Sequence, residues 1–342
     1  MRKLFVIPIL LILSGCTPGP PRPMNEYTGY TEGTTFHITY DKGAAGDLKP
    51  EIDQLLDEIS RSLSLYDPTS LICRVNRTDS LIAADRHFVS VFEISQKIYG
   101  ETGGAYNPAI YPMVKFWGFG VGDNTAYDAV DSAAVDSLRP FVRFDDVQIV
   151  QQGSATYIRK KRPGIQLDFN AIIKGYTVDQ LSALLDSKGI ANYMIEVGGE
   201  TSAKGKDAKG EAWMIGIDKP IEDPNDRELV AIARISNSSI ASSGSYRKYY
   251  VKDGMKYSHT IDPSTGYPVS HTLVSASVFG PTCAEADAYA TAFMVMGVER
   301  SKKFVEKHPS LSIYLIYTNY KGEWETYISE GLKERLEVVK KK

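Results

Sequence analysis

One segment of this sequence places a carboxylate and a hydroxyl where both could bind the same metal ion. The stretch AEADAYATAFMVMG (284–297) carries Asp287 and Thr291 four residues apart, and side chains at this spacing share one face of an α-helix. Carboxylate and hydroxyl oxygens are hard ligands that suit Mg²⁺, with waters and phosphate completing its shell. The alternative is a structural pair, in which the Thr bonds to its own helix and the Asp favours the helix N-terminus.

Two further segments could bind a ligand. The stretch LDFNAIIKGYTVDQ (167–180) runs from a strand end into a helix near Lys174, and helix N-termini attract anions. The stretch GGAYNPAIYPMVKFWGFG (103–120) combines glycines with aromatic residues, so its backbone could approach a ligand and a ring could stack on it. A solvated lysine in a first helical turn and a loop that packs its own aromatic residues are equally compatible with these segments.

A histidine precedes a strong turn signal in YSHTIDPSTGYPVS (257–270). In DPSTG, Pro263 fixes φ at a turn corner and Gly266 supplies a positive φ. The turn explains neither His259 just upstream nor the serine-rich stretch SSGSY (242–246) before it. An unperturbed histidine titrates near pH ~6.5, so His259 could accept a proton from a hydroxyl. This segment is therefore a candidate edge of an active site.

Several familiar enzyme classes lack support in this sequence. No GxGxxG follows a predicted strand, HExxH and GxSxG are absent, and the chain has only 5 His. The stretch GETSAKGKD (199–207) differs from a P-loop because its spacing is one residue too long and Asp207 stands where a Ser or Thr is needed. The formal net charge of -3 argues against a nucleic-acid partner bound through a broad basic surface.

Hydrophobic periodicity predicts the elements that must position these residues. In 50–65, for example, Ile52, Leu56 and Ile59 form the apolar stripe of an amphipathic helix. The predicted helices are 50–65, 88–102, 128–139, 174–189, 283–296 and 299–308. The predicted strands are 33–40, 146–150, 155–160, 165–168, 191–199, 212–218, 230–236 and 273–279, with hairpins at 246–261 and 312–329. Because strands and helices follow no strict βαβ order, the sequence predicts an α+β fold, with mixed sheets flanked by helices, in a single catalytic unit.

The N-terminus is typical of an exported lipoprotein. MRKLFVIPILLILSGC has Arg2 and Lys3 before an apolar run that is too short to span a membrane, and its LSGC ending resembles a bacterial lipobox. The resemblance implies cleavage before Cys16 and a lipid on its sulfur, which anchors a chain without spanning the membrane. The alternative is an ordinary signal peptide with an incidental cysteine. We expect an exported, lipid-anchored protein on the periplasmic side of the inner or outer membrane of a bacterium.

Composition predicts the domain boundaries, and the surroundings of the two other cysteines predict their state. We predict a lipoprotein signal peptide over 1–15, a lipid-anchored tether over 16–29, a catalytic domain over 30–331 and a basic tail over 332–342. Cys73 and Cys283 could pair in an oxidising compartment. They form no CxxC and lie in apolar stretches, which favours buried free thiols.

Taken in order, several segments of the chain resemble one protein family. They are SLYDPTSLICRVN, GGAYNPAIYP, LDFNAIIKGYTVD, IEVGGE, ASSGSYRKYY, SHTIDPSTGYPV and EADAYATAFMVMG. An ordered set of motifs is far more specific than any one of them. On these segments, which extend over most of 30–331, the chain resembles the ApbE family of bacterial FAD:protein FMN transferases.

The resemblance implies an ApbE, T-fold-like architecture and a reaction that uses Mg²⁺ and FAD. Members of the family cleave the FAD pyrophosphate and transfer FMN to a Thr or Ser hydroxyl of a target flavoprotein, which releases AMP. Targets are typically subunits of membrane redox complexes or exported reductases, and these would be the partners of this chain. Some relatives mainly hydrolyse FAD to FMN and AMP. An FAD pyrophosphatase therefore stays open as an alternative, as does a non-catalytic FAD-binding lipoprotein.

The resemblance also assigns residues position by position. Asp287 and Thr291 match the side-chain metal ligands, and Ala171 matches a position whose backbone carbonyl completes the protein's share of the metal shell. His259 matches the histidine proposed to act near the transferred phosphate. The positions that match FAD contacts are Tyr66, Ala105, Tyr106, Asn107, Asp168, Lys174 and Ile261.

The sequence departs from the family pattern at several positions. Asn170 stands where Gly or Ser is usual, and Ile173 stands where Ala is frequent. Asn107 replaces an Asp, which removes one charge from the pocket. Glu32 stands where a Met often precedes the first GT, and because a carboxylate beside a flavin would be unusual, we assign no flavin contact to position 32. None of these departures touches the predicted metal ligands.

Overall fold

The computed structural model describes residues 21–43, 46–121, 132–221, 228–245, 249–252 and 255–339. The predicted signal peptide, the predicted lipidation site Cys16 and the first part of the predicted helix 128–139 lie outside these residues. In the part of the chain that is described, no helix has the length and apolar character needed to cross a membrane.

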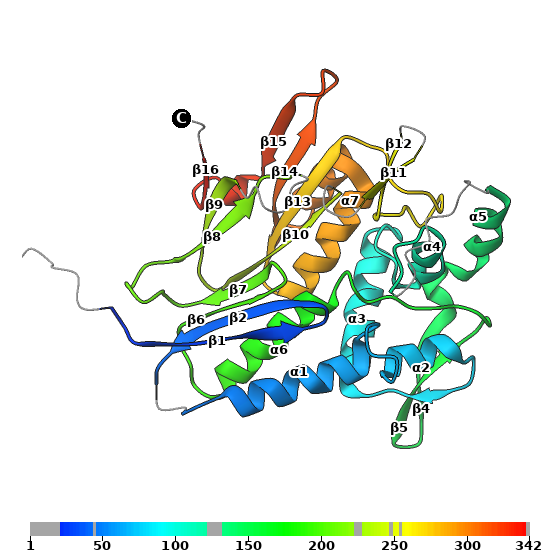
Figure 1. The fold of residues 1–342 in the computed structure, drawn as a ribbon, viewed down its shortest axis with the longest axis horizontal. Coiled ribbons are helices and arrows are strands. Elements are labelled where there is room, and N and C mark those ends of the chain that lie inside the picture. The colour runs from blue at the N-terminus through cyan, green and yellow to red at the C-terminus, as the bar shows by residue number, and fades with distance from the viewer. Residues whose placement is uncertain are drawn as a thin grey trace, which may run out of the picture.

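An eight-stranded antiparallel sheet forms the centre of the molecule (Figure 1). Its strands in spatial order are β1 (Met24–Thr31), β2 (Thr34–Asp41), β6 (Tyr193–Val197), β7 (Glu200–Lys204), β10 (Ser238–Gly244), β13 (Leu273–Gly280), β14 (Ser312–Thr318) and β15 (Trp324–Ile328). Successive side chains of a strand point to opposite faces, and in β14 both faces are buried. Ile313 and Leu315 pack into one hydrophobic core, whereas Tyr314 and Ile316 pack into another on the opposite face. The sheet is therefore a middle layer.

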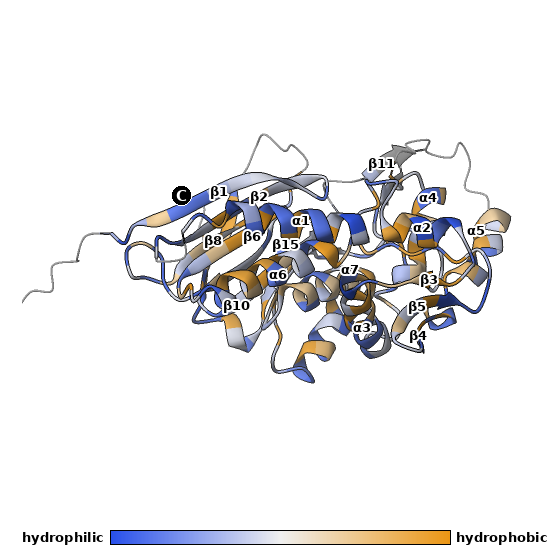
Figure 2. Cartoon of the chain, turned by 90° about the horizontal axis from the view of Figure 1, so that it is seen from below, coloured by the Kyte–Doolittle hydropathy of each residue, from blue (hydrophilic) through white to orange (hydrophobic). Residues whose placement is uncertain are grey.

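Each face of the sheet has its own cover. The helices on one face are α1 (Lys49–Leu63), α6 (Ile173–Ser187) and α7 (Cys283–Glu306), and the smaller sheet on the other consists of β16 (Leu336–Val338), β9 (Leu229–Ile235) and β8 (Trp213–Asp218). In α1 the predicted stripe of Ile52, Leu56 and Ile59 is buried. Figure 2 views α1 from its outer side and shows many hydrophilic residues there. Burial of a one-sided apolar stripe explains why this segment is helical.

The rest of the chain forms a lobe beside the large sheet, on the right in Figure 1. Its helices are α2 (Leu71–Arg77), α3 (Arg86–Glu101), α4 (Tyr111–Phe116) and α5 (Ser132–Leu138). Its strands are β3 (Ile82–Ala83), β4 (Val147–Gln152), β5 (Ala155–Lys160), β11 (Tyr249–Lys252) and β12 (Met255–Ser258). Residues of α3 and α7 share one hydrophobic core, so the lobe and the sheet form a continuous unit.

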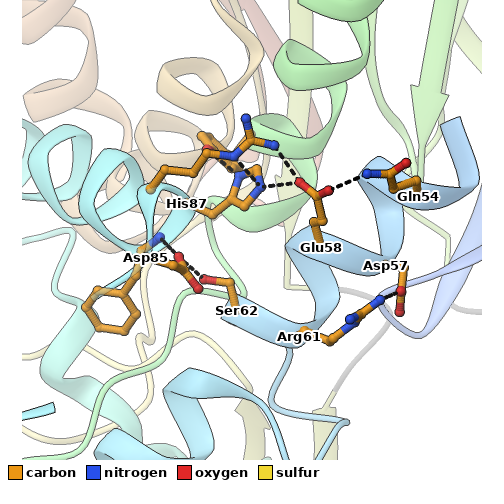
Figure 3. Close-up of polar contacts among 10 residues, drawn as sticks. Gln54, Asp57, Glu58, Arg61, Ser62, Asp85 and His87 are labelled. Carbon is orange, nitrogen blue, oxygen red and sulfur yellow. Dashed lines mark hydrogen bonds and ion pairs between the residues drawn. The ribbon is translucent and has the colours of Figure 1, made fainter. Parts of the chain in front are cut away.

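A polar network ties α6 to α1 and α3, and Figure 3 shows its contacts between α1 and α3. His87 on α3 is buried, with its Nδ1 2.9 Å from the Tyr176 hydroxyl on α6 and its Nε2 3.8 Å from Glu58 on α1. Asp85, which caps α3, also accepts a hydrogen bond from Ser62 of α1 at 2.7 Å. Burial lowers the pKa of His87, which favours the neutral imidazole as the link. The network fixes the first turns of α6 relative to both neighbouring helices.

Gly175 lets α6 and α7 meet closely. A Cβ added at this position would lie 2.3 Å from the carbonyl oxygen of Cys283, so any larger residue would push the helices apart. Asp179 on α6 accepts hydrogen bonds from the backbone N–H groups of Cys283 and Ala284, at 2.8 and 2.9 Å. A carboxylate at this place satisfies the free donors of the first turn of α7. The start of α6, with Lys174, is thereby held against the start of α7.

The two cysteines of the described domain are free thiols, as the sequence favours. Cys283 is fully buried, with its Sγ 3.7 Å from the carbonyl of Thr201. Cys73 is partly buried, with its Sγ 3.8 Å from the carbonyl of Leu65. Burial raises the pKa of the Cys283 thiol, so this group is a poor nucleophile.

The predicted α+β architecture is confirmed. The predicted helices 50–65, 88–102 and 174–189 correspond to α1, α3 and α6. The predicted hairpin at 246–261 corresponds to β11 and β12, although its turn lies outside the described residues. The sequence separates 283–296 from 299–308, and the structure has a kink inside α7 between them, where Gly297 adopts a non-helical φ of 74°.

Other expectations differ from the structure. Residues 24–29, expected to belong to the tether, form most of β1 because they pair with β2. Residues 165–168 are not a strand, because the Asn76 side chain occupies the backbone N–H and C=O of Leu167, both at 2.7 Å. Part of the expected basic tail forms β16 on the edge of β9, where burial of Leu336 holds it.

Candidate active site

Lys174 and Glu200 form the central ion pair of the candidate site. Lys174 lies in the first turn of α6, and its Nζ is 2.6 Å from Oε2 of Glu200 at the start of β7. The glutamate side chain is 3% exposed and the lysine side chain 27% exposed. Lys174 therefore holds a buried carboxylate while part of its own side chain stays accessible to a ligand.

Asp287 on α7 is a second buried carboxylate near this lysine. Its Oδ2 accepts a hydrogen bond from the backbone N–H of Gly175 at 3.1 Å. Burial raises the pKa of both carboxyls, although the charge of Lys174 opposes the shift. Burial also disfavours the charged form of Lys174, but Glu200 and Asp287 outweigh it and raise its pKa. The ammonium form of Lys174 is therefore favoured, and the carboxyl groups of Glu200 and Asp287 both interact with it.

Two of the predicted metal ligands, Asp287 and Thr291, lie on α7, and the third, Ala171, lies just before α6, the helix that carries Lys174. Thr291 is one turn beyond Asp287, and its Oγ1 is 3.2 Å from Oγ of Ser243 on β10. Ala171 is half-buried just before α6. A carboxylate, a hydroxyl and a carbonyl oxygen fit the preference of Mg²⁺ for hard ligands. No three His, Cys, Asp or Glu side chains are grouped to hold a metal among the described residues, so such an ion would also depend on hydroxyl, carbonyl and non-protein oxygens.

The segment that leads into α6 is joined to the loop after α3. The backbone N–H of Asp168 donates to the carbonyl of Pro108 at 2.7 Å, and Oδ1 of Asp168 accepts from the N–H of Asn170 at 2.7 Å. Pro108 directly follows 105–107, the residues predicted to contact FAD. The structure therefore brings Asp168 and this loop together, although they lie far apart in the sequence.

Two side chains of this loop support its shape. Tyr106 is 2% exposed, and its hydroxyl is 2.9 Å from that of Ser95. The Asn107 side chain accepts from the N–H of Ala109 at 2.9 Å and donates to a backbone carbonyl at 3.3 Å. With both side chains engaged in this way, the loop backbone is the part best placed to meet a ligand. The FAD contacts of the loop stay a prediction.

Tyr66 follows α1 in the chain, lies against the tip of the β1–β2 hairpin and is 50% exposed. A Cβ added at Gly33, in the turn of this hairpin, would lie 3.3 Å from the Tyr66 ring. The preceding residue, Glu32, accepts a hydrogen bond from the Thr177 hydroxyl of α6 at 2.8 Å. The tip of the hairpin thus brings a further carboxyl group to the start of α6 and contacts the accessible ring of Tyr66.

His259 and Ile261 belong to a different group of residues, next to α4. The His259 ring is half-buried, with its centroid 6.2 Å from that of Phe119. Ile261 is 5% exposed and packs in a hydrophobic cluster with Trp117. The indole N–H of Trp117 donates to the carbonyl of Gly266 at 2.8 Å, which anchors the DPSTG turn. The turn therefore fixes the backbone around His259, whose catalytic role stays a prediction.

Sequence reasoning missed Glu200 and Ser243 and left Glu32 without a role. Glu200 follows Gly198 and Gly199, which both have positive φ in the turn from β6 to β7. This pair of glycines before an acidic residue was the available signal for Glu200, and the run of serines was the signal for Ser243. Neither signal identifies a partner, because the partners lie on other elements.

The ion pair of Lys174 and Glu200 leads to a prediction about the free energy of unfolding. Replacing Lys174 with Met should destabilise the fold by about 3–5 kcal/mol, because it leaves the buried Glu200 carboxyl without its cation. Adding Glu200→Leu should restore most of this loss, which urea unfolding of the single and double variants would measure. Lys188→Met is the matched control, because its exposed pair with Glu51 should contribute about 1 kcal/mol or less. An unchanged stability in Lys174→Met would contradict the assigned pairing.

Comparison with known proteins identifies the family of this chain. The model of the ApbE family matches residues 33–315. The chain is 32% identical over 334 residues to the FAD:protein FMN transferase of Klebsiella pneumoniae, covering 93% of each chain, and 31% identical over 337 residues to that of Escherichia coli K12, covering 95% of each. The solved structure of the flavin transferase ApbE from Vibrio cholerae matches with a TM-score of 0.81 and 32% identity, covering 92% of this chain and 100% of that one. The chain therefore belongs to the ApbE family.

Proposed function

We propose that this chain is an FAD:protein FMN transferase that moves FMN from FAD to a Thr or Ser hydroxyl of a target flavoprotein, depends on Mg²⁺ and releases AMP. The transferase class rests on relatives that carry this name at 31–34% identity over most of both chains. The observation that carries the proposal is the position of Lys174 beside Glu200 and Asp287, where α6 meets α7. A positive charge beside hard oxygen ligands suits a pyrophosphate.

Residues of this chain account for each part of the reaction. Mg²⁺, held by Asp287, Thr291 and the Ala171 carbonyl, would neutralise charge on the pyrophosphate. Lys174 adds positive charge from the first turn of α6. His259 accepts the proton of the acceptor hydroxyl while that oxygen attacks the phosphorus of the FMN half. The bond from this phosphorus to the bridging oxygen breaks, and AMP leaves with that oxygen.

The remaining proposed contacts surround the same nucleotide. They are Tyr66, Ala105, Tyr106, Asn107, Asp168 and Ile261. The half-exposed ring of Tyr66 suits stacking on a planar ligand. The bond between Asp168 and Pro108 supports the 105–107 loop as a second wall.

We also propose an exported location for the protein. The lipobox-like LSGC supports a lipid anchor at Cys16, which would keep the enzyme at the membrane surface. Acceptors in membrane redox complexes or exported reductases would then be within reach. Mass spectrometry of the mature N-terminus tests the proposed anchor. A lipid-modified Cys16 is expected, and an unmodified Cys16 would contradict the lipid anchor.

Transfer can be tested directly with the full-length chain. The chain is mixed with FAD, Mg²⁺ and a candidate acceptor domain that carries the target Thr or Ser. A denaturing gel should show flavin fluorescence on the acceptor band, with AMP released in equal amount, and EDTA should abolish both. AMP without a fluorescent acceptor would instead indicate an FAD pyrophosphatase that uses water at the same site. FAD binding with neither product would indicate a non-catalytic carrier.

A further inference from the structure

Glu32 occupies an unusual backbone conformation at the edge of the candidate site. It precedes Gly33 in the two-residue turn between β1 and β2, and both residues have positive φ, 52° and 76°. Such turns favour this conformation, but glutamate seldom adopts it. Figure 1 shows the tip of this hairpin next to the helices that cover one face of the large sheet, and Glu32 contacts α6 there. The hairpin therefore holds the Glu32 side chain against α6.

The carboxyl group of Glu32 is only partly satisfied. Oε1 accepts the hydrogen bond from Thr177 at 2.8 Å, whereas Oε2 is buried and has no hydrogen-bond partner among the described residues. Among the described residues, the charged groups that act on it are Lys174, Asp287 and Glu200. Burial raises the pKa of Glu32 to about 8, against the opposing effects of Thr177 and Lys174. Burial therefore favours the neutral carboxyl of Glu32 near pH 7, and ionisation needs a higher pH than in an exposed glutamate.

Ionisation of Glu32 would add a further negative charge that interacts with Lys174. Among the described residues, Lys174 is the cation that acts on Glu32, and its Nζ already lies 2.6 Å from Glu200. A buried carboxylate oxygen without a donor is costly. Once charged, the Glu32 carboxylate would therefore attract the Lys174 ammonium and weaken the interaction of this lysine with any other anion.

We propose that Glu32 is a positioning residue that acts through Lys174: its neutral carboxyl leaves the lysine to the phosphates of an anionic nucleotide, and its ionised carboxylate competes with them. The inference rests on the proposed function, since it takes FAD to be that nucleotide. It assigns a role to a carboxyl group that the transfer chemistry does not use. The affinity for FAD should therefore be constant at neutral pH and fall at alkaline pH.

Binding of FAD in EDTA separates this effect from turnover. Flavin fluorescence anisotropy would give the Kd for the full-length chain between pH 6.5 and 9.5. Above the pKa, each titrating carboxyl should weaken binding by about tenfold per pH unit. Glu32→Gln cannot ionise, so it should lower this slope by about one log unit per pH unit. Glu200 can contribute a slope of its own, which Glu32→Gln would leave in place.

Two variants complete the test. Glu26→Gln removes the same charge from an exposed position on β1 and should keep the wild-type slope. Thr177→Val removes the hydrogen bond that favours ionised Glu32, so the pH at which FAD affinity begins to fall should be higher than in the wild type. The inference is overturned if Glu32→Gln keeps the full slope, or if wild-type affinity does not change with pH. Should Glu32→Gln fail to fold, Thr177→Val decides: a shift of the FAD-affinity profile to higher pH supports the inference, and no shift or a shift to lower pH overturns it. Absence of FAD binding at every pH would instead refute the proposed function.

Discussion

Replacing Asp287 with Asn should lower FMN transfer by about 10³-fold or more while the protein stays folded. A bound metal ion contributes several kcal/mol of charge stabilisation in a transition state, and each ~1.4 kcal/mol corresponds to a factor of ten in rate. Asn keeps the shape of the side chain and an oxygen that can accept from the N–H of Gly175, which Asp287 does at 3.1 Å. The substitution therefore removes the charged metal ligand but not the contact between α6 and α7.

The measurement is acceptor fluorescence on a denaturing gel together with AMP release, at increasing Mg²⁺ concentration. Glu299→Gln is the matched control, because it removes a charge from an exposed position on the same helix and should leave the rate unchanged. Circular dichroism and thermal unfolding would verify the fold of both variants. A rate near that of the wild type in Asp287→Asn would rule out this carboxylate as a metal ligand.

Replacing His259 with Ala should lower transfer by roughly 10²–10⁴-fold, the usual contribution of a positioned general base. Affinity for FAD should change little, because the residue is proposed to act on the acceptor hydroxyl. The anchored turn supports this separation of roles, since Trp117 holds the carbonyl of Gly266 at 2.8 Å and keeps the local backbone in place. Single-turnover transfer and equilibrium FAD binding would be measured in parallel.

A second histidine supplies the control for this variant. His37 on β2 makes a local contact with Thr39, at 3.3 Å, and His37→Ala should transfer FMN at the normal rate. The pH profile of wild-type transfer should rise as the base loses its proton, and this limb should be lost in the residual activity of His259→Ala. Normal transfer by His259→Ala would show that another group accepts the proton.

The sequence predicted much of the fold because its signals are local. The apolar stripe of Ile52, Leu56 and Ile59 determines that this segment is helical and which face is buried. Gly297 marks a break in α7 because its φ of 74° cannot continue a helix. The errors arose where a distant partner decided the outcome: Asn76 takes the hydrogen bonds of Leu167, which would otherwise suit a strand.

The candidate site divides in the same way. The spacing of Asp287 and Thr291 within one helix, and the position of Lys174 at the start of another, are readable from the sequence because each depends on neighbours along the chain. Only the tertiary structure decided that Glu200 and Glu32 also act on this lysine, from β7 and from the β1–β2 turn. Burial and the distance between charges determine which carboxyl groups ionise near neutral pH. Both quantities arise when separate segments pack together, so they have no local pattern in the sequence.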